Sequence, residues 1–327
     1  MEENKTISEK PTGKLGTFRL FLKTIRGIRQ EKWGDKTGYL FIFPLVSMWL
    51  VFGAFPYLRG IIIPFQDFRW INPESWSPFH SFNGVANFIE MFHDWRVWRG
   101  MKAAFFLYLS WFPITFALSL ITAIILSKIR AKKISAIYRV IIVLPWVIPG
   151  AAAMPMWGSI YDPNFGYLNH LLSDILKIWK YPPAWGSNSF WYWPAIGVAC
   201  AWKGFGYYML LFLIGFYNIP EELYEAARLD GANAWDEFRH ISLPGIRNIM
   251  FLFLVTNVSF LGAGIVEMMT FGTGPLDIGA TLNYYGYMQA FTGNMRMGYG
   301  AAMFFFSGVV TLIFVSMIFK FFRTEKA

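Results

Sequence analysis

Long apolar runs alternate with short polar or charged stretches along most of the chain. A helix needs roughly 20 mostly apolar residues to cross a membrane. Six runs meet this length, at about 38–58, 103–127, 140–161, 190–217, 247–267 and 297–319, and only the fourth has a charge near its middle, Lys203. The pattern predicts an all-α polytopic membrane protein with six transmembrane helices.

Composition narrows the class further. Of 327 residues, 55% are hydrophobic and 15% charged, which excludes an ordinary soluble domain. The single cysteine, Cys200, excludes a disulfide framework and a cysteine-based metal cluster. The net charge of +9 comes from basic residues beside apolar runs, a pattern typical of cytoplasmic loops. We therefore expect membrane lipid, and no nucleic acid, as a partner.

The distribution of Lys and Arg predicts the orientation, because cytoplasmic loops carry an excess of both. Basic residues gather in segment 1–37, in the connection 128–133 and after residue 319. Both termini should therefore be cytoplasmic, with 38–327 as the transmembrane domain. Within 15–32, apolar residues recur at helical spacing among basic ones, which indicates an interfacial amphipathic helix or, alternatively, a basic tail without fixed structure. Segment 1–37 is too long for a signal-peptide n-region and no small-residue cleavage site follows it, so it should be retained.

The connection 218–246 is more than a linker. Pro220 suits a first helical position, and Glu221 and Glu222 follow in the first turn, where the helix dipole favours acids. A short helix should run to about Leu229, turn at Asp230 and Gly231, and be followed by a second short helix over 234–240. The first helix has a narrow apolar face of mostly small side chains, which suits insertion into a cleft of another protein.

The same connection resembles the "EAA" loop of bacterial ABC import permeases, in which EAA is followed by three residues, G, nine residues, I, one residue and LP. All seven positions match, at Glu225, Ala226, Ala227, Gly231, Ile241, Leu243 and Pro244. In that family the loop docks as a coupling helix into an ATPase subunit. The resemblance implies a type I ABC importer transmembrane domain whose ATPase-coupling residues are Leu223, Glu225, Ala226, Ala227, Asp230, Gly231, Ala232, Ile241, Leu243 and Pro244.

Three further stretches resemble the maltose and glycerol-phosphate type permeases of the sugar-uptake branch. They are YRVIIVLPWVIPG with its continuation, the WKG of the fourth run, and FGTGPLDIGATLNYYGYMQAF with MGYGAAM. The resemblance covers roughly 38–322. Residues 271–275 read FGTGP and so depart from the branch's plain TGGP order.

The resemblance implies a heteromeric complex in the bacterial cytoplasmic membrane. Its other parts would be a second permease subunit, an ATPase dimer and an extracytoplasmic solute-binding protein, and its substrate a sugar or oligosaccharide. The chain has no P-loop pattern, so it should be no enzyme itself and hold no cofactor, with ATP and Mg bound by the partner ATPase.

Candidate pathway residues lie in the fourth and fifth runs. Asn257 is about 11 residues into the fifth run, or roughly 16 Å, near the centre of a core about 30 Å thick. A sugar needs hydrogen-bonding groups there, and aromatic faces to stack on. Together with the family's contact region, this points to Gly204, Tyr207, Tyr208, Asn257, Phe260 and Gly264. Packing between helices is the alternative role for all of them.

Two pairs of charged residues remain open. Lys203 could attract an acidic substrate, pair with Glu267 near the end of the fifth run, or extend its charged end toward the membrane surface, and we favour one of the last two. His170 and Asp174 have i, i+4 spacing, but two ligands without a third are a poor metal site, so we expect no metal.

Other functions compete with the sugar permease. An importer of the same type could carry glycerol-phosphate or an acidic oligosaccharide. A membrane-embedded glycan-modifying enzyme would need clustered acids or a nucleophile with a base, and the four His residues are scattered. A secondary transporter would show an internal repeat of spans, and none is visible.

Overall fold

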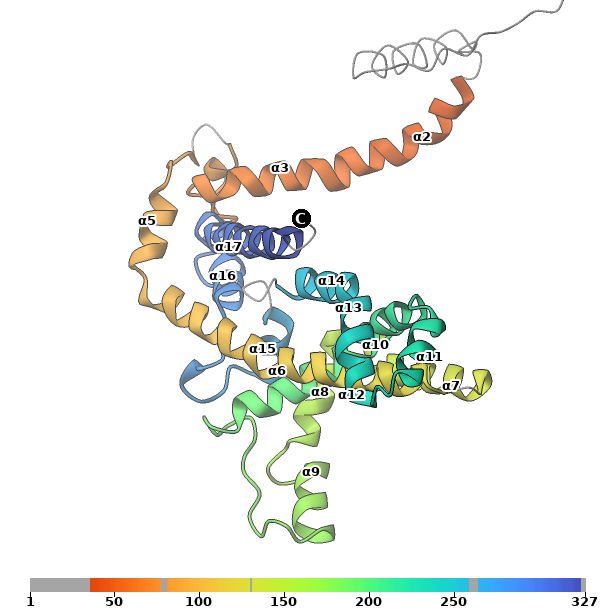
Figure 1. The fold of residues 1–327 in the computed structure, drawn as a ribbon. Helices are drawn as coiled ribbons and strands as arrows, with labels where there is room; N and C mark the ends of the chain where they lie inside the picture. Colours follow the sequence, from red (N-terminus) through yellow and green to blue (C-terminus); the bar gives the residue numbers. More distant parts are fainter. Residues whose placement is uncertain (1–35, 78–80, 130, 259–263, 325–327) are drawn as a thin grey trace, which may run out of the picture. The chain divides into compact units, whose positions relative to one another are not determined.

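The computed structural model describes residues 36–77, 81–129, 131–258 and 264–324 (Figure 1). These residues are mostly helical, and within them only two isolated bridges have β geometry, Gln66–Phe82 and Arg69–Arg296. The helix predicted over 15–32 lies outside the described residues. The chain divides into residues 1–60 and a main unit of residues 61–327.

The described part of the first unit is one apolar helical stretch. It consists of α2 (Lys36–Trp49), the π-helical turn η1 (Leu50–Ala54) and α3 (Phe55–Ile62), and Phe41–Phe65 has a mean hydropathy of 1.8. A helix that is apolar on every side is typical of a membrane span.

Three long helices, α6 (Trp95–Ser127), α10 (Tyr192–Tyr217) and α17 (Met297–Thr324), dominate the described part of the main unit. The helix α6 packs along α10, and α17 packs against α16 (Leu282–Phe291). The remaining helices are α5 (Ala86–His93), α7 (Lys132–Val147), α8 (Gly150–Ile160), α9 (Tyr167–His170), α11 (Glu221–Leu229), α12 (Ala234–Glu237), α13 (Leu243–Gly245), α14 (Arg247–Asn257) and α15 (Ile265–Phe271). Short 3-10 or π turns are η2 (Ile63–Phe65), η3 (Pro73–Trp76), η4 (Leu171–Ile175), η5 (Phe238–Ser242) and η7 (Pro275–Asp277).

Among the described residues, four helices are long and apolar enough to cross a membrane, or five if one bent pair counts as a span. The four are Phe41–Phe65, Trp95–Ser127, Tyr192–Tyr217 and Met297–Phe322, which correspond to the first, second, fourth and sixth predicted spans. The other two predicted spans differ from a continuous helix.

The third predicted span is broken. Its two halves, α7 and α8, meet at an angle of 95° around Ile148 and Pro149. Proline has no backbone N–H to donate and disfavours a helical conformation of the residue before it, and Ile148 is accordingly extended. Hydropathy reports that both halves are apolar, but it does not report the bend.

The fifth predicted span is also interrupted. The helix α14 ends at Asn257, and α15 begins only after Gly264, which has a φ of +99°. Such a backbone conformation favours glycine. Residues 247–267 therefore form two helices in the described chain.

A close approach between backbones fixes the position of α10. A Cβ atom added to Gly206 would lie 2.1 Å from the carbonyl oxygen of Ile142 in α7, and one added to Gly197 would lie 2.5 Å from that of Ser110 in α6. Small residues at helix contacts are the usual device for close packing in membranes. Between these helices and α14, the core contains the aromatic rings of Phe112, Phe116, Phe212 and Phe253.

A polar cluster joins the corner between α5 and α6 to the start of α17. Arg296 donates to Glu90, with one nitrogen–oxygen distance of 2.8 Å, and lies over the ring of Tyr299. The hydroxyl groups of Tyr285 and Tyr299 both donate to Asp94, at 2.8 and 2.9 Å. The hydrogen bond with Glu90 raises the pKa of Arg296.

The contact at Gly206 gives a stability test. We expect Gly206→Ala to lower the apparent melting temperature of the detergent-solubilised protein, because the new methyl group would overlap the Ile142 carbonyl. Overpacking of this kind costs about 1–3 kcal/mol. Gly308 in α17 has nothing within 4 Å of an added Cβ. Gly308→Ala should therefore leave the melting temperature unchanged or raise it, and equal losses in both variants would contradict the assignment.

Candidate functional site

A cavity of about 200 Å³ lies where the broken helices meet the α6–α10 pair. Its walls come from α6, α7, α8, α10, α14 and α15, and are formed by Leu107, Trp111, Trp146, Met154, Cys200, Lys203, Gly204, Tyr208, Asn257 and Glu267. Four of these helices begin or end at a break beside the cavity: α7 and α8 at one break, and α14 and α15 at the other. Substrate sites of membrane transporters are commonly built from such discontinuous helices.

Aromatic rings form one part of the cavity wall. Trp111, Trp146 and Tyr208 line it, and Tyr207 stacks behind Trp146 with ring centroids 4.9 Å apart and an interplanar angle of 15°. Tyr208 in turn packs edge-on against Phe253 of the core. These contacts restrict the rings, so the cavity presents fixed aromatic surfaces.

Polar groups from three helices, α10, α14 and α15, face the same space. Asn257 is only 5% exposed, and its amide donates to the Phe253 carbonyl at 2.7 Å. Lys203 and Glu267 are half-buried, and no ion pair or hydrogen bond joins either to another described residue. The pairing considered from the sequence is therefore not formed in this structure, although both side chains line one cavity.

The structure brings together only part of the predicted pathway set. Gly204, Tyr208 and Asn257 line the cavity, whereas Tyr207 supports it from behind. Gly264 precedes α15 and packs against Thr281 and Leu107, and Phe260 lies outside the described residues.

Sequence reasoning missed other wall residues, among them Trp111, Trp146 and Cys200. Trp146 could have been found, because it lies three residues before Pro149, where a proline predicts a break in the span. Nothing in the sequence singles out Trp111 from the other aromatic residues of its helix.

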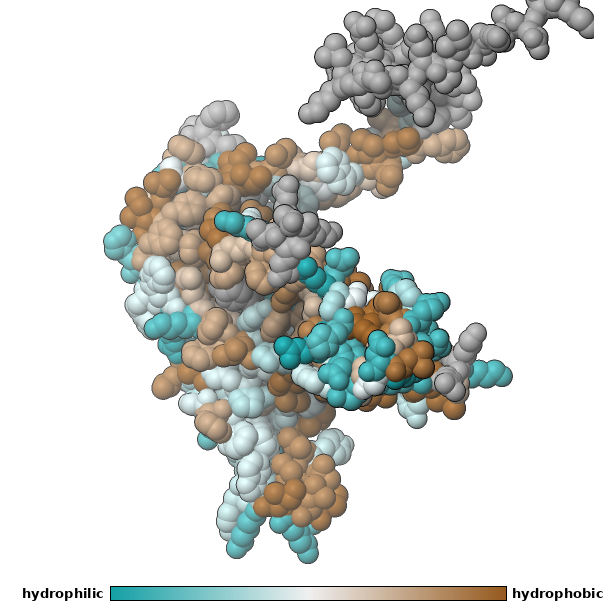
Figure 2. All heavy atoms as spheres, viewed as in Figure 1, coloured by the Kyte–Doolittle hydropathy of each residue, from teal (hydrophilic) through white to brown (hydrophobic). Residues whose placement is uncertain are grey.

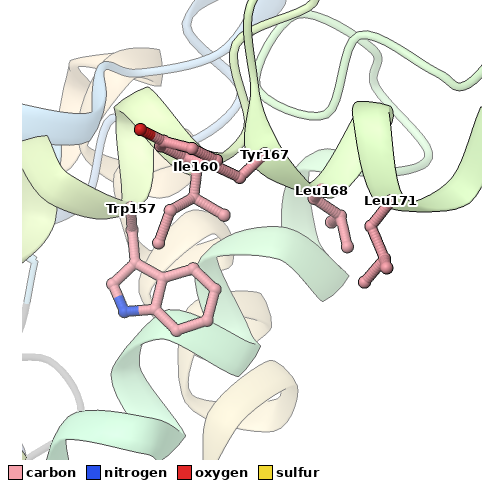
Figure 3. A pocket seen from close by; sticks show the side chains of 5 residues that line it. All are labelled: Trp157, Ile160, Tyr167, Leu168 and Leu171. Atoms are coloured by element: carbon pink, nitrogen blue, oxygen red, sulfur yellow. The ribbon is translucent and has the colours of Figure 1, made fainter. Parts of the chain in front are cut away.

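A second cavity, of about 370 Å³, lies between α8 and the α9–η4 segment. Figure 3 shows its five lining side chains, Trp157, Ile160, Tyr167, Leu168 and Leu171. Ligand sites usually add a few convergent polar groups to an apolar wall. This cavity presents almost entirely carbon, so it is a poorer candidate for a polar solute.

The segment that follows α10 folds as predicted locally. The helix α11 (Glu221–Leu229) ends in a Schellman motif, in which Ala232 N–H donates to the Ala227 carbonyl at 2.9 Å and Gly231 N–H to the Arg228 carbonyl at 3.1 Å. Gly231 has a φ of +85°, as this motif requires. A capping box of Asn233 and Asp236 then starts α12.

Two contacts hold α11 against α12 and the turn η5 that follows it. Arg228 Nε donates to Glu237 Oε1 at 2.7 Å, and Tyr224 and Ser242 share a hydrogen bond of 2.9 Å. The bond with Glu237 raises the pKa of Arg228. Because Glu237 is buried, this ion pair also supplies the carboxylate with its counter-charge.

The outer surface of this helix pair carries apolar side chains among charged ones. Leu223, Leu229 and Trp235 are 51%, 89% and 63% exposed. Figures 1 and 2 show α11 and α12 on a different side of the main unit from α9, with hydrophobic patches inside a hydrophilic surface. Of the predicted coupling residues, Glu225, Ala226, Asp230, Gly231 and Pro244 are exposed, and Ala227, Ala232, Ile241 and Leu243 are half-buried.

The pair His170 and Asp174 is a surface contact. His170 Nδ1 lies 2.6 Å from Asp174 Oδ2, both side chains are 63% exposed, and the histidine lowers the pKa of the carboxyl group. Within the described residues no group of three or more His, Cys, Asp or Glu side chains is placed to hold a metal ion.

Known proteins resemble this chain over most of its length. Residues 115–324 match the family described as "Binding-protein-dependent transport system inner membrane component". The probable ABC transporter permease protein YesP of Bacillus subtilis is 32% identical over 91% of this chain and 93% of its own. The diacetylchitobiose uptake system permease protein NgcF of Streptomyces coelicolor is 28% identical, over 84% and 78%.

A solved structure has the same fold. It is a bacterial ABC transporter involved in the import of the acidic polysaccharide alginate, with a TM-score of 0.75 and 21% identity, and the similarity covers 94% of this chain and 99% of that one.

The contact between α11 and α12 can be tested by hydrogen exchange. Arg228→Gln removes the counter-charge of Glu237, so we expect faster amide exchange over 221–237 with exchange in α10 unchanged. Glu225→Gln, which alters an exposed side chain of the same helix, is the matched control. Unchanged protection in the Arg228 variant would mean that the ion pair does not hold the two helices together.

Proposed function

This chain belongs to the family of binding-protein-dependent transport system inner membrane components, and we propose that it forms half of the translocation pathway of an ABC importer for a sugar or oligosaccharide. The observation that carries the proposal is the cavity between the broken helices, with its aromatic walls and its Asn257, Lys203 and Glu267 side chains. The family is one of transport permeases, so the chain is no enzyme in its own right.

A sugar suits this cavity chemically. The apolar face of a pyranose ring stacks on aromatic side chains, and its hydroxyl groups need donors and acceptors in a water-poor site. Trp111 and Trp146 offer such faces, and Lys203, Asn257 and Glu267 offer the polar groups. The similarity to a diacetylchitobiose permease points to the same substrate class.

The size of the cavity supports a paired subunit. Its volume of about 200 Å³ is below the roughly 300–1,000 Å³ of typical ligand pockets, so it has room for about one sugar ring. A longer glycan would need further walls, and we assign these to a second permease subunit. A solute-binding protein delivers the substrate from outside.

Coupling to ATP is assigned to α11 and α12. The EAA positions on this exposed helix pair would dock into an ATPase subunit, which binds ATP and Mg. We further propose a six-span topology in which the broken pair α7–α8 is the third span. The helices α14 and α15 belong to the fifth span. Both termini are cytoplasmic in this topology.

Purification through a tag on this chain tests the assembly. The chain is expressed with its neighbouring genes, and the eluate is assayed for ATP hydrolysis with candidate binding proteins, each loaded with a sugar. We expect an ATPase to co-purify and at least one loaded binding protein to stimulate hydrolysis. A chain that purifies alone, without ATPase activity, would contradict the proposal.

A substitution at Gly231 tests the coupling residues. Gly231→Val forces a β-branched residue into a left-handed conformation, at a cost of about 1–2 kcal/mol, which lowers the population of the native turn roughly 5- to 30-fold. We expect a loss of uptake with normal membrane insertion. Gly231→Asn should retain more uptake, because asparagine tolerates this conformation better.

Gly293→Val is the matched control. Gly293 also has a positive φ, +58°, and open space around it, but it lies between α16 and α17. The Gly293→Val substitution should lower the stability of the protein by a comparable amount, but it should leave ATP hydrolysis coupled to uptake. Full uptake by the Gly231 valine variant would count against the coupling assignment.

A further inference from the structure

Two opposite charges face the proposed sugar cavity without neutralising each other. Lys203 comes from α10 and Glu267 from the first turn of α15, and among the ten residues that line the cavity they are the only charged ones. Neither has an ion-pair or hydrogen-bond partner in the described chain. Both are half-buried, so some other polar group must solvate them.

Charged side chains inside a membrane protein are costly, and they persist where they meet a partner, water or a substrate. A direct ion pair would satisfy both groups and leave nothing for a ligand. Because the two groups do not pair, the Lys203 ammonium group can donate hydrogen bonds to water or a solute, and the Glu267 carboxylate can accept them. The cavity has the volume of about six or seven liquid water molecules.

We propose that Lys203 and Glu267 are specificity-determining residues that select a neutral, polyhydroxylated sugar ring. The inference rests on the proposed function and deepens it. Each ring hydroxyl can accept a hydrogen bond from the Lys203 ammonium group and donate one to the Glu267 carboxylate, while the ring face lies on Trp111 or Trp146.

The charge balance decides between a neutral and an acidic sugar. Lys203 alone would attract a carboxylate, but Glu267 in the same small cavity repels one. A neutral ring meets no such repulsion and uses both groups. The alginate importer that shares this fold is involved in the import of an acidic polysaccharide. A neutral substrate would therefore distinguish this chain from that structural neighbour.

The chain contains its own reporter for this cavity. Cys200 is the only cysteine in the sequence, and it lines the same cavity as the two charges. Its reaction with small thiol reagents in the assembled complex reports on the cavity, and ratios of rates between reagents are compared because Lys203 and Glu267 also act on the thiol itself. This readout bypasses the solute-binding protein, which imposes a selection of its own.

The first arm measures charge without a sugar. Cationic, anionic and neutral methanethiosulfonate reagents are compared on the wild-type complex, Lys203→Met and Glu267→Gln. We expect little charge preference in the wild type, a shift toward the cationic reagent in the Lys203 variant and a shift toward the anionic one in the Glu267 variant. Lys180→Met and Glu74→Gln remove the same charges from exposed sites outside the cavity and should change nothing. Unchanged preferences in the cavity variants would overturn the inference.

The second arm measures protection of Cys200 by added sugar. Diacetylchitobiose is the neutral probe, and an alginate oligosaccharide is the acidic one. We expect the neutral probe to protect better. In each cavity variant, the concentration of diacetylchitobiose that gives half-maximal protection should rise roughly ten- to a hundredfold, because a hydrogen bond to a charged group is lost. Lys203→Arg and Glu267→Asp keep the charges, so these variants should lose less of the protection by sugar. This comparison distinguishes a loss of sugar contacts from a folding defect.

Two results would overturn the inference while leaving the proposed function standing. Stronger protection by the acidic probe, lost in Lys203→Met and improved in Glu267→Gln, would assign an acidic substrate. Equal protection in all variants would make the two charges irrelevant to selection. In contrast, a complex without any bound ATPase would contradict the proposed function itself.

Discussion

The structure depends on one constraint: a backbone in a lipid environment must satisfy its own hydrogen bonds, so a membrane helix can break only where protein or water covers the break. The bend at Pro149, the end of α14 at Asn257 and the start of α15 after Gly264 are all placed around one space. The Asn257, Lys203 and Glu267 side chains beside these breaks supply the polar groups of that space. The cavity is thus a consequence of where the helices are interrupted.

The helix α10 links the cavity to the segment α11–α12. Gly197 and Gly206 place its backbone against α6 and α7, while Lys203, Gly204 and Tyr208 on the same helix reach the cavity. Only the short stretch around Pro220 separates its C-terminal end from α11. The ion pair between Arg228 and Glu237 joins α11 to α12. The N-terminal end of this helix pair is connected to α10, and its C-terminal end is connected through α13 to α14. A force on the pair would therefore act on both α10 and α14. Both of those helices line the cavity.

Sequence reasoning found what depends on local chemistry and missed what depends on backbone continuity. Pro220, Asp230 and Gly231 predicted the ends of α11 because caps and turns are set by the residues that form them. Hydropathy predicted the apolar runs but treated 140–161 and 247–267 as continuous, since it does not record a bend at Pro149 or a positive φ at Gly264. Tyr207 and Tyr208 were indistinguishable by sequence, and only packing assigns one to the cavity wall and the other to the support behind Trp146.

Two surfaces of the chain are incomplete by physical criteria, and α10 connects them. The cavity is too small for an oligosaccharide and contains two charges that have no ion-pair or hydrogen-bond partner among the described residues. The α11–α12 surface exposes Leu229 and Trp235 among charged residues. Exposed apolar side chains rimmed by polar ones are typical of protein interfaces. A second permease at the cavity and an ATPase at the helix pair would complete both, which explains why one chain would retain two costly features at once. In such an assembly, a movement of the helix pair would reach, through α10, the cavity that Lys203 and Glu267 line.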